Sequence, residues 1–459
     1  AEDDPPADDP PAEDDPPADD PPAEDDPPNQ SQSRLYEGAG FDGPAVELDP
    51  VGDPMAPGYD CKAIARWDVV PWQDTQDGFT VGVVAYHREG IAWVDFSLNG
   101  GPWVRVTEPL ENARTGEIEY FAELALDVVG ASDLEIRAVV VPNSGIPRVL
   151  SGPISPASLA SGEHSMFLRA PDVRPEFFVS PNGSDTTGDG SRVNPFRTIP
   201  HAVLYGAGGG ITGADVSGSI LTLLPGDYHY EFGNSVTLSN GWLTVRSDDS
   251  VPSSATRFTS YAQQAYLHKI HLKDLQVVQP EGETRWASYE GGAYLWIDTC
   301  DLQGGFVNTN MLAGYAGKWG TDCTALDVKN RPFGNKIIRN CHVVGVLADA
   351  FGEEDLLLNS SVTRLSREQS PETAEAHPDV WQKRNPDGIV ENVILRDVTA
   401  LVDIESQGVF FSGTPAGFFD VALVNVNVNN SWTFNGQDSV FICFSIYNPV
   451  KHVLLYDSS

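Results

Sequence analysis

The chain has 459 residues, of which 66 are Asp or Glu and 28 are Lys or Arg, so its formal net charge at pH 7 is −38. This length allows two or three domains. The charge argues against binding to nucleic acid or to an anionic membrane, because no basic patch is available to replace counterions. No run of about 18 apolar residues could span a bilayer, and the five cysteines match no metal-binding spacing such as CxxC. The sequence starts at Ala1 without Met, which fits a mature product after removal of a secretion signal, so we expect an extracellular or cell-surface protein.

An acidic, proline-rich repeat dominates the first 33 residues. Residues 1–28 repeat AEDDPP and ADDPP, and they contain thirteen acidic residues, ten prolines and no Lys or Arg. Such a segment cannot bury apolar surface and its charges repel one another, so residues 1–33 are predicted to be a disordered, solvated spacer. Cation capture by the Asp pairs is the alternative, although a disordered chain provides no fixed coordination sphere. A linker is predicted over residues 34–58.

Short apolar strands alternate with turn signals over residues 59–152. Asn99-Gly100-Gly101, for example, marks a hairpin, because Gly and Asn tolerate the positive φ of such turns. Several strands in so short a segment predict a small antiparallel β-sandwich, and the pattern resembles the Ig-like modules of secreted bacterial proteins. Residues 69–73 and Trp103 could line a sugar-binding face, but a buried aromatic core is the favoured interpretation. Residues 153–175 are predicted to be a linker.

A six-residue pattern recurs after residue 176. It consists of an apolar residue, any residue, then Asn, Asp or Thr, a small or apolar residue, any residue and an apolar residue. The polar third position falls at Asp274, Thr299, Asn340, Asn359, Asp397, Asn425 and Asp457. Most of the spacings match the roughly 20–45 residues of a solenoid repeat, and we assign the longest, from Thr299 to Asn340, to a coil with an inserted loop. Residues 176–459 are therefore predicted to form a parallel β-solenoid.

The same pattern predicts where its polar and small residues lie. Alternating apolar residues should point into the solenoid, while the polar residue sits at a bend and bonds to its equivalent one coil away, as in an Asn ladder. Cys300 and Cys341 share one register position. We expect both to be small buried fillers, because free Cys is among the most buried residue types. A disulfide between them is the alternative in an oxidising medium.

The entrance to this region carries a family resemblance. Phe178–Asp185 is followed by the string Asn194–Val203, and Ile220–Tyr228 then gives an apolar strand and a Pro-Gly-Asp-Tyr turn. This order resembles the opening of secreted right-handed parallel β-helix proteins of the pectate-lyase-like superfamily. The resemblance implies an all-β chain with a right-handed parallel β-helix over 176–459. It implies less about function, because this scaffold hosts polysaccharide lyases, glycoside hydrolases, epimerases and non-catalytic adhesins.

The most suggestive candidate site is the string Ala376-His-Pro-Asp-Val-Trp-Gln382, followed by two cations. Asp379 lies eighteen residues before the ladder position Asp397, and Gln407 has the same offset from Asn425. If Asp349 belongs to the preceding coil, these side chains stack about 4.8 Å apart. His377, Asp379 and Trp381 then share one exposed face of a strand, because strand side chains alternate. The candidate substrate-binding residues are Asp349, Glu354, Trp381, Gln382, Gln407 and, from the long spacing, Tyr315, Lys318 and Trp319.

Two reactions fit these residue types. In a lyase, a base removes the proton next to a uronate carboxylate, and His377, Asp379, Lys383 and Arg384 form the candidate catalytic group, with the cations and the His as bases. Asp349 and Asp379 would then be Ca²⁺ ligands, since Ca²⁺ prefers carboxylate oxygens. In a hydrolase, two of Asp349, Asp379 and Glu354 would supply the carboxyl pair. Elimination is favoured over hydrolysis. A purely structural role, with Asp379 capping a bend and Gln382 satisfying an amide, is the other interpretation.

The sequence thus predicts a secreted, carbohydrate-active β-helix protein that binds and cleaves polysaccharide, with Ca²⁺ as a candidate cofactor. The alternative is a non-catalytic structural or adhesive protein. Ser459 comes only two residues after the last ladder position, Asp457, which predicts an uncapped solenoid end. Unpaired strand edges of this kind template association, so a homo-oligomer or an end-to-end assembly is expected in that case.

Overall fold

The computed structural model divides the chain into two units, residues 1–46 and residues 47–459, and every residue that it describes belongs to the second. The predictions for residues 1–33 and 34–58 fall outside the described residues. The described ranges are 61–75, 78–98, 102–123, 133–150, 166–169, 174–208, 218–229, 241–259, 269–278, 287–288, 294–304, 312–313, 317–328, 336–346, 349–352, 355–365, 379–384, 390–402, 408–412, 418–430, 433–434, 437–438, 444–446 and 450–458.

The first folded part is a β-sandwich made of two antiparallel sheets. One sheet has the order β1-β2-β6-β5; in the other, β4-β3-β7-β8 form a path and β9 pairs with β7. The predicted small antiparallel β-sandwich is therefore confirmed, while an Ig-like relationship stays a prediction. The strand bounds are β1 (Ile64–Trp67), β2 (Thr80–Tyr86), β3 (Ile91–Leu98), β4 (Val104–Val106), β5 (Leu110–Asn112), β6 (Glu117–Glu123), β7 (Asp133–Pro142), β8 (Arg148–Val149) and β9 (Met166–Arg169).

Inward-facing residues of both sheets share one apolar core. Trp67, for example, packs on Phe96 with ring centroids 6.2 Å apart. Strand β9 contributes Met166 and Leu168 to this core, although it lies within residues 153–175, which the sequence predicts as a linker. That expectation is wrong for β9, because its alternating apolar residues complete the second sheet rather than remain in solvent.

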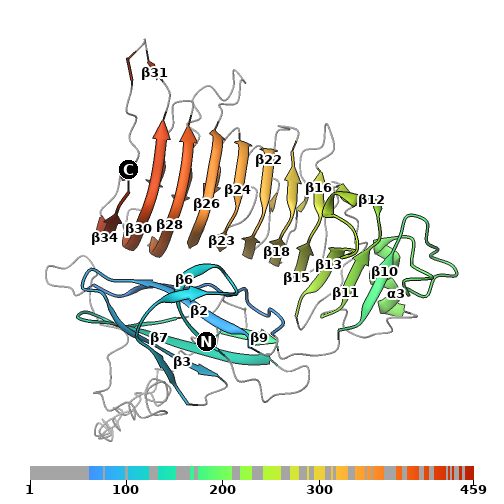
Figure 1. Ribbon diagram of the computed structural model, residues 1–459, viewed down its shortest axis with the longest axis horizontal. Helices are drawn as coiled ribbons and strands as arrows, with labels where there is room; N and C mark the ends of the chain where they lie inside the picture. Colours follow the sequence, from blue (N-terminus) through green and yellow to red (C-terminus); the bar gives the residue numbers. More distant parts are fainter. Residues whose placement is uncertain are drawn as a thin grey trace, which may run out of the picture. The chain divides into compact units, whose positions relative to one another are not determined.

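The second folded part is a parallel β-helix, as predicted. A 17-stranded sheet runs in chain order from β10 to β34 (Figure 1), and all of its pairings are parallel between strands of successive coils. The strands are β10 (Glu176–Val179), β11 (Ile220–Leu223), β12 (Gly226–His229), β13 (Leu243–Ser247), β14 (Thr256–Thr259), β15 (Lys269–Lys273), β16 (Gln276–Val278), β18 (Tyr294–Asp298), β19 (Asp301–Gln303), β21 (Gly317–Thr321), β22 (Thr324–Val328), β23 (Ile337–Arg339), β24 (His342–Val346), β26 (Leu356–Leu365), β28 (Val390–Val402), β30 (Phe418–Asn430) and β34 (Val450–Tyr456).

Smaller sheets accompany this one. The largest is parallel, with the order β25-β27-β29-β33, and the strands β17 and β20 form a parallel pair while β31 and β32 form an antiparallel pair. The bounds are β17 (Ala287–Ser288), β20 (Leu312–Ala313), β25 (Phe351–Gly352), β27 (Trp381–Arg384), β29 (Val409–Ser412), β31 (Thr433–Phe434), β32 (Gln437–Asp438) and β33 (Phe444–Ile446). Within the described ranges, the helical elements are α3 (Ile199–Gly208) and the short 3-10 turn η1 (Ser253–Ala255). No helix in the described part of the chain is long and apolar enough to cross a membrane.

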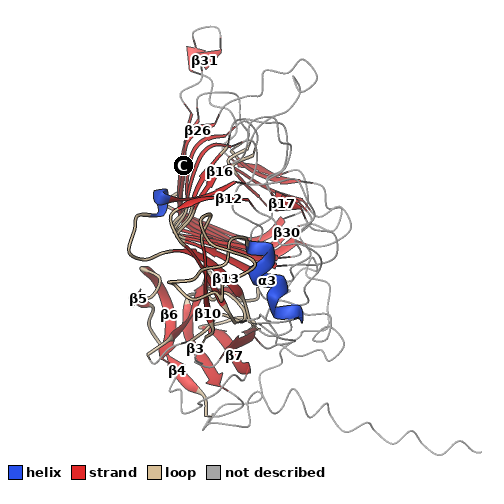
Figure 2. Cartoon of the chain, turned by 90° about the vertical axis from the view of Figure 1, so that its right-hand side faces the viewer, coloured by secondary structure: helices blue, strands red, loops and turns tan. Residues whose placement is uncertain are grey.

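Helix α3 lies beside β10 at the start of the stack (Figures 1 and 2). It buries Ile199, Ala202 and Val203 in the same core as Val179 and Phe196, which belong to the first coil. The string Asn194–Val203 thus forms an apolar cover for the first strands of the β-helix.

The polar ladder lies at the bends of the coils, as predicted. All seven predicted positions have positive φ, for example 51° at Asn340 and 50° at Asn425. Asn340 Nδ2 donates to Asp322 Oδ1 at 2.8 Å, and Asp322 also has positive φ. The loop predicted between Thr299 and Asn340 is therefore wrong: β21 and β22 form a complete extra coil there, which the hexad search missed because Gly320 replaces its first apolar residue.

Asn340 can stabilise its bend in two ways, by tolerating positive φ and by its side-chain hydrogen bond, and two substitutions should separate these contributions to the free energy of unfolding. Asn340→Ala is expected to lower the free energy of unfolding by about 1–2 kcal/mol, because Ala tolerates the left-handed region poorly and loses the bond to Asp322. Asn340→Gly, which keeps the backbone conformation accessible, should cost less. Urea unfolding of both variants measures the difference. Equal losses would show that the backbone conformation of Asn340 contributes nothing.

The cysteine positions form an internal column. Cys300, Cys323 and Cys341 are buried and free, and Cys300 N lies 3.5 Å from Cys323 Sγ in the next coil. Burial raises the pKa of Cys300 and of Cys323 well above that of an exposed thiol. The prediction that Cys300 and Cys341 are small buried fillers is confirmed, and the alternative disulfide is absent because the extra coil carrying Cys323 lies between them.

The sandwich covers part of the outer face of the main sheet. One outward column of this sheet is apolar, and its members meet Ile64, Val70 and Val84 of the sandwich in a single buried cluster. The column consists of Trp296, Trp319, Ile337, Leu356, Ile394 and Ala422. The β-helix strands are therefore apolar on both faces, which the alternation rule for a one-sided sheet does not anticipate.

Three buried ion pairs also join the sandwich to the β-helix. Arg339 Nη1 lies 2.6 Å from Asp68 Oδ1, Arg148 Nη2 lies 2.5 Å from Asp420 Oδ2, and Arg396 donates to Glu117. All six side chains are less than a tenth exposed. The interface thus combines apolar packing with buried charge pairs.

Candidate functional site

The predicted stacking of Asp349 beside Asp379 is present in the structure. Strand β25 pairs with β27 so that Phe351 faces Trp381, which puts Asp349 in register with Asp379. The backbone N–H of Asp379 donates to Asp349 Oδ1 at 3.1 Å. Gln407 lies outside the described residues, directly before Gly408, whose carbonyl accepts the N–H of Val380 at 2.9 Å. Strand β29, which follows Gln407 in the chain, pairs with β27, so the equal ladder offsets of Asp379 and Gln407 correspond to neighbouring coils.

The orientation of this row differs from the expectation. Asp379 and Trp381 were expected on an exposed face, but Asp379 is 1% exposed and Trp381 is fully buried in the core of the coil. The Trp381 ring packs on Phe411 with centroids 5.0 Å apart. Gln382, on the opposite side of β27, is also buried. The polar and aromatic row is thus mainly internal, because Trp381 points from the sheet β25-β27-β29-β33 into the apolar core.

Two carboxylates in adjacent coils do not by themselves form a Ca²⁺ site. Ca²⁺ takes six to eight oxygen ligands. Among the described residues, no group of three or more His, Cys, Asp or Glu side chains is arranged to hold a metal ion. The set formed by Asp349 and Asp379 therefore does not fit Ca²⁺ in the part of the chain that the structure describes.

The other predicted site residues divide into two groups. Trp319 is buried in the interface with the sandwich, where its ring lies 5.7 Å from that of Trp242, so it belongs to a strand rather than to an inserted loop. Lys383 is buried as well and pairs with a carboxylate described below. Four of the remaining positions lie outside the described residues, namely His377, Glu354, Gln407 and Tyr315. For Lys318 and Arg384 the structure describes the backbone but not the side chain.

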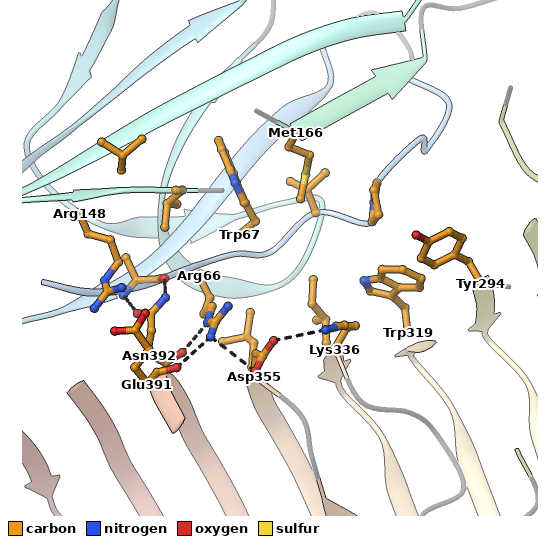
Figure 3. Close-up of a pocket in the computed structure, with 17 residues that line it drawn as sticks. Arg66, Trp67, Arg148, Met166, Tyr294, Trp319, Lys336, Asp355, Glu391 and Asn392 are labelled. Atoms are coloured by element: carbon orange, nitrogen blue, oxygen red, sulfur yellow. Dashed lines mark hydrogen bonds and ion pairs between the residues drawn. The ribbon is translucent and has the colours of Figure 1, made fainter. Parts of the chain in front are cut away.

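A cavity of about 370 Å³ lies between the sandwich and the β-helix (Figure 3). Its upper wall in the figure carries Arg66 and Trp67 of β1 and Met166 of β9. Its lower wall carries side chains from successive coils of the β-helix, namely Tyr294, Trp319, Lys336, Asp355, Glu391 and Asn392. Cavities that combine apolar walls with a few convergent polar groups are the usual form of a ligand site.

Asp355 is the electrostatic centre of this cavity. Its carboxylate lies 2.6 Å from Lys383 Nζ, 3.5 Å from Arg66 Nη2 and 3.9 Å from Lys336 Nζ. Burial alone would raise the pKa of Asp355, but Arg66, Lys383 and Lys336 outweigh that effect and hold the pKa at about 2. The carboxylate is therefore ionised throughout the physiological range. Lys383, which the sequence predicts to be a catalytic residue, thus pairs with Asp355 and is not itself part of the cavity wall.

Asn392 fixes the sandwich strand that carries Arg66. The Asn392 amide donates to the carbonyl of Ala65 at 2.6 Å and accepts the N–H of Ala65 at 2.7 Å, so it pairs with β1 as a neighbouring strand would. Arg66 Nε donates to the carbonyl of Asn392, and Arg66 Nη2 donates to the carbonyl of Glu391 at 3.1 Å. Asn392 has a φ of 61°, a conformation that Asn tolerates better than most residues. The guanidinium is thereby held at the cavity wall.

The other end of the cavity is aromatic. The Tyr294 ring lies 5.9 Å from that of Trp319 and 5.3 Å from that of Trp72 in the sandwich. Lys269 Nζ lies 4.1 Å from the centroid of the Trp72 ring, a cation–π distance. Figure 3 shows Tyr294 and Trp319 side by side next to Lys336. The cavity therefore has a cationic end and an aromatic end.

Sequence reasoning missed Arg66, Tyr294, Lys336, Asp355 and Asn392. A signal was present: the triplet Leu356-Leu357-Leu358 and the run Val393-Ile394-Leu395 do not alternate, which indicates strands buried on both faces. Such runs indicate that another domain covers the sheet. They do not indicate which residues of that domain meet it, so the identity of Arg66 could not be derived.

These features define a parallel β-helix protein with a β-sandwich packed on its main sheet. No protein-family model matches the chain, and no curated protein matches it.

Several solved structures resemble the chain at low identity. The pectate lyase Pel9A is 14% identical, with a TM-score of 0.35 over 62% of this chain and 80% of that one. The Family 28 exopolygalacturonase of Yersinia enterocolitica is 8% identical, with a TM-score of 0.31 over 86% of each chain. The catalytic unit of the GH87 alpha-1,3-glucanase of Streptomyces thermodiastaticus is 11% identical, with a TM-score of 0.23 over 86% of each chain. At these scores the likeness carries no argument about activity.

Proposed function

We propose that the protein binds a polysaccharide in the cavity between the sandwich and the β-helix. The observation that carries this proposal is the meeting of the aromatic pair Tyr294 and Trp319 with the charged cluster on Asp355 in one cavity. Aromatic rings offer the apolar face of a sugar a flat surface, while charged and polar groups recognise its substituents. An extracellular or cell-surface location is part of the proposal, because polymeric glycans are ligands of that compartment.

The direction of the bound chain follows from the origin of the lining residues. Tyr294, Trp319, Ile337 and Leu356 come from the consecutive strands β18, β21, β23 and β26. Neighbouring strands lie about 4.8 Å apart, which is close to the length of one sugar unit. A sugar chain along the stack would therefore meet one coil per unit.

Cleavage of the bound chain is the second candidate function, and elimination is favoured over hydrolysis. Hydrolysis by a carboxyl pair needs one carboxyl that is protonated at the working pH. Asp355, with a pKa of about 2, cannot donate that proton. The cations Arg66 and Lys336 instead suit a reaction in which a carboxylate next to the abstracted proton has to be neutralised.

Removing the exposed part of the aromatic wall should weaken binding. Tyr294→Ala is expected to raise the Kd for the best-bound polysaccharide at least tenfold, because the ring is the half-buried member of the aromatic pair. Calorimetric titration with a panel of neutral and acidic oligosaccharides measures this effect. Tyr456→Ala is the matched control, since Tyr456 is 68% exposed on β34 and does not line the cavity.

The outcomes separate the competing functions. Unsaturated products that absorb in the ultraviolet would show elimination, and new reducing ends without them would show hydrolysis. Binding without turnover would make this a non-catalytic binding protein. If no oligosaccharide binds, or if both Tyr variants lose affinity equally, the proposal is wrong. Large assemblies seen by light scattering would then favour the adhesive or structural alternative.

A further inference from the structure

Cations outnumber carboxylates in the wall of the cavity, although the chain as a whole carries a net charge of −38. Arg66, Arg148 and Lys336 line the cavity together with the two carboxylates Asp355 and Glu391. Arg148 is already neutralised by Asp420, at 2.5 Å. The charges that remain for a ligand are therefore those around Asp355 and the exposed carboxylate of Glu391.

The carboxylate of Asp355 already has an ion-pair partner, Lys383, that does not line the cavity. Lys383 Nζ donates to it at 2.6 Å, and the Lys383 side chain is 11% exposed. Arg66 and Lys336 lie farther away, at 3.5 Å and 3.9 Å, and their side chains are 27% and 40% exposed. Among the described residues, the Lys336 side chain makes this ion pair and no hydrogen bond, while its backbone carbonyl accepts from Asp355 and Leu356. Two accessible cations thus share a carboxylate that a third cation already neutralises.

We propose that Arg66 and Lys336 form a subsite for an acidic group of the ligand, either a carboxylate or a sulfate ester. Both groups present several oxygen acceptors. Because Arg66 Nε and Nη2 donate to the carbonyls of Asn392 and Glu391, the Nη1 side of its guanidinium is the one that would donate to the ligand. The proposal rests on the function proposed above and adds the charge class of the sugar. The neighbouring aromatic end of the cavity then receives the ring of the same sugar or of the next one.

The subsite is shared between the two folded parts. Lys336 precedes β23 of the β-helix, whereas Arg66 comes from β1 of the sandwich, and Figure 3 shows both directed at Asp355. Asn392 acts as a positioning residue, because its amide and its carbonyl fix Ala65 and Arg66. The sandwich is thus a component of the binding site and not a separately tethered module.

The test compares three charge-removing variants on matched ligands. Lys336→Gln and Arg66→Gln are each expected to raise the Kd for an acidic oligosaccharide at least tenfold and to reduce the salt dependence of binding, while the affinity for a neutral oligosaccharide of equal length stays unchanged. Arg257→Gln is the control, because Arg257 is an exposed cation on β14, paired with Asp227 and remote from the cavity lining. A uronate ligand and a sulfated ligand are titrated separately, which distinguishes the two acidic groups.

Each result has a definite reading. If Lys336→Gln binds acidic ligands as tightly as the unaltered protein, or loses neutral ligands equally, the acidic subsite is wrong while the polysaccharide site stands. If the unaltered protein binds neither class, the proposed function itself is wrong. Lys336→Gln leaves the contacts of the sandwich intact, so it remains informative even if Arg66→Gln lowers the thermal unfolding temperature.

Discussion

Asp68→Ala is expected to lower the free energy of unfolding by about 3–5 kcal/mol, one of the largest effects that a single substitution outside the apolar core can produce here. Asp68 is 1% exposed in the sandwich, and its carboxylate lies 2.6 Å from Arg339 Nη1 of the β-helix. Removing the carboxylate leaves a guanidinium that is buried in the interface without its partner. The penalty is the desolvation of that charge rather than the loss of one contact.

Urea unfolding of a small set of variants tests this expectation. The control is Asp227→Ala, because the pair of Asp227 with Arg257 is 3.5 Å long and about half exposed, and such pairs contribute at most about 1 kcal/mol. The double variant Asp68→Leu with Arg339→Met should be more stable than Asp68→Ala, since it leaves no unpaired charge. If Asp68→Ala costs no more than Asp227→Ala, the ion pair does not hold the interface in solution.

The buried ion pairs of the interface also explain why the sandwich and the β-helix belong to one compact unit. Asp68, Glu117 and Arg148 in the sandwich each pair with an oppositely charged residue of the β-helix. Separating the two parts would break all three of these pairs. We therefore regard the sandwich as part of the β-helix architecture, whereas the sequence suggested two domains joined by a linker.

The sequence predicted the β-helix well because the signal repeats. Leu272 pairs with Ile297, Ile338 with Leu357, and Leu395 with Leu423, as the hexads require. Each bend needs a residue that tolerates positive φ, so Asn and Asp recur at fixed positions. A periodic constraint of this kind can be read even when one copy, at Asp322, is degenerate.

The candidate site could not be predicted in the same way, because it depends on contacts between segments that are distant in the sequence. Arg66 and Asn392 are 326 residues apart in the chain, and no pattern links them. The string around Asp379 was predicted to be a catalytic site because it contains the residue types that such sites use. Its Asp and Trp side chains are instead buried within the coil, and among its described side chains Lys383 is the one that binds a residue of the cavity wall, Asp355.

Glu119 supplies a second large effect, one that depends on pH. Its side chain is buried on the face of β6 opposite the core residues Tyr120 and Ala122, toward the β-helix. There Oε1 accepts from Asn112 Nδ2 at 2.6 Å and from Thr115 Oγ1 at 2.8 Å. Gly82 makes room for it, since a Cβ at that position would lie 2.0 Å from Glu119 Oε2. Burial and the nearby Asp68 raise the pKa of Glu119 from 4.5 to about 8, and the cation Arg114 does not offset them.

The protein is therefore expected to lose stability as the pH rises from about 5 to 8. In the unfolded chain Glu119 ionises near pH 4.5, whereas the folded protein keeps the proton until about pH 8. Because the folded state binds this proton more tightly, Glu119 contributes its full share to the free energy of unfolding below pH 4.5. Between pH 4.5 and pH 8 the free energy of unfolding then falls by up to about 1.4 kcal/mol per pH unit. Urea unfolding at several pH values should show this slope in the unaltered protein and in Glu111→Gln, whose side chain is exposed on β5, but not in Glu119→Gln. Parallel pH profiles for all three proteins would mean that Glu119 is ionised in the folded state and that Arg114 balances it after all.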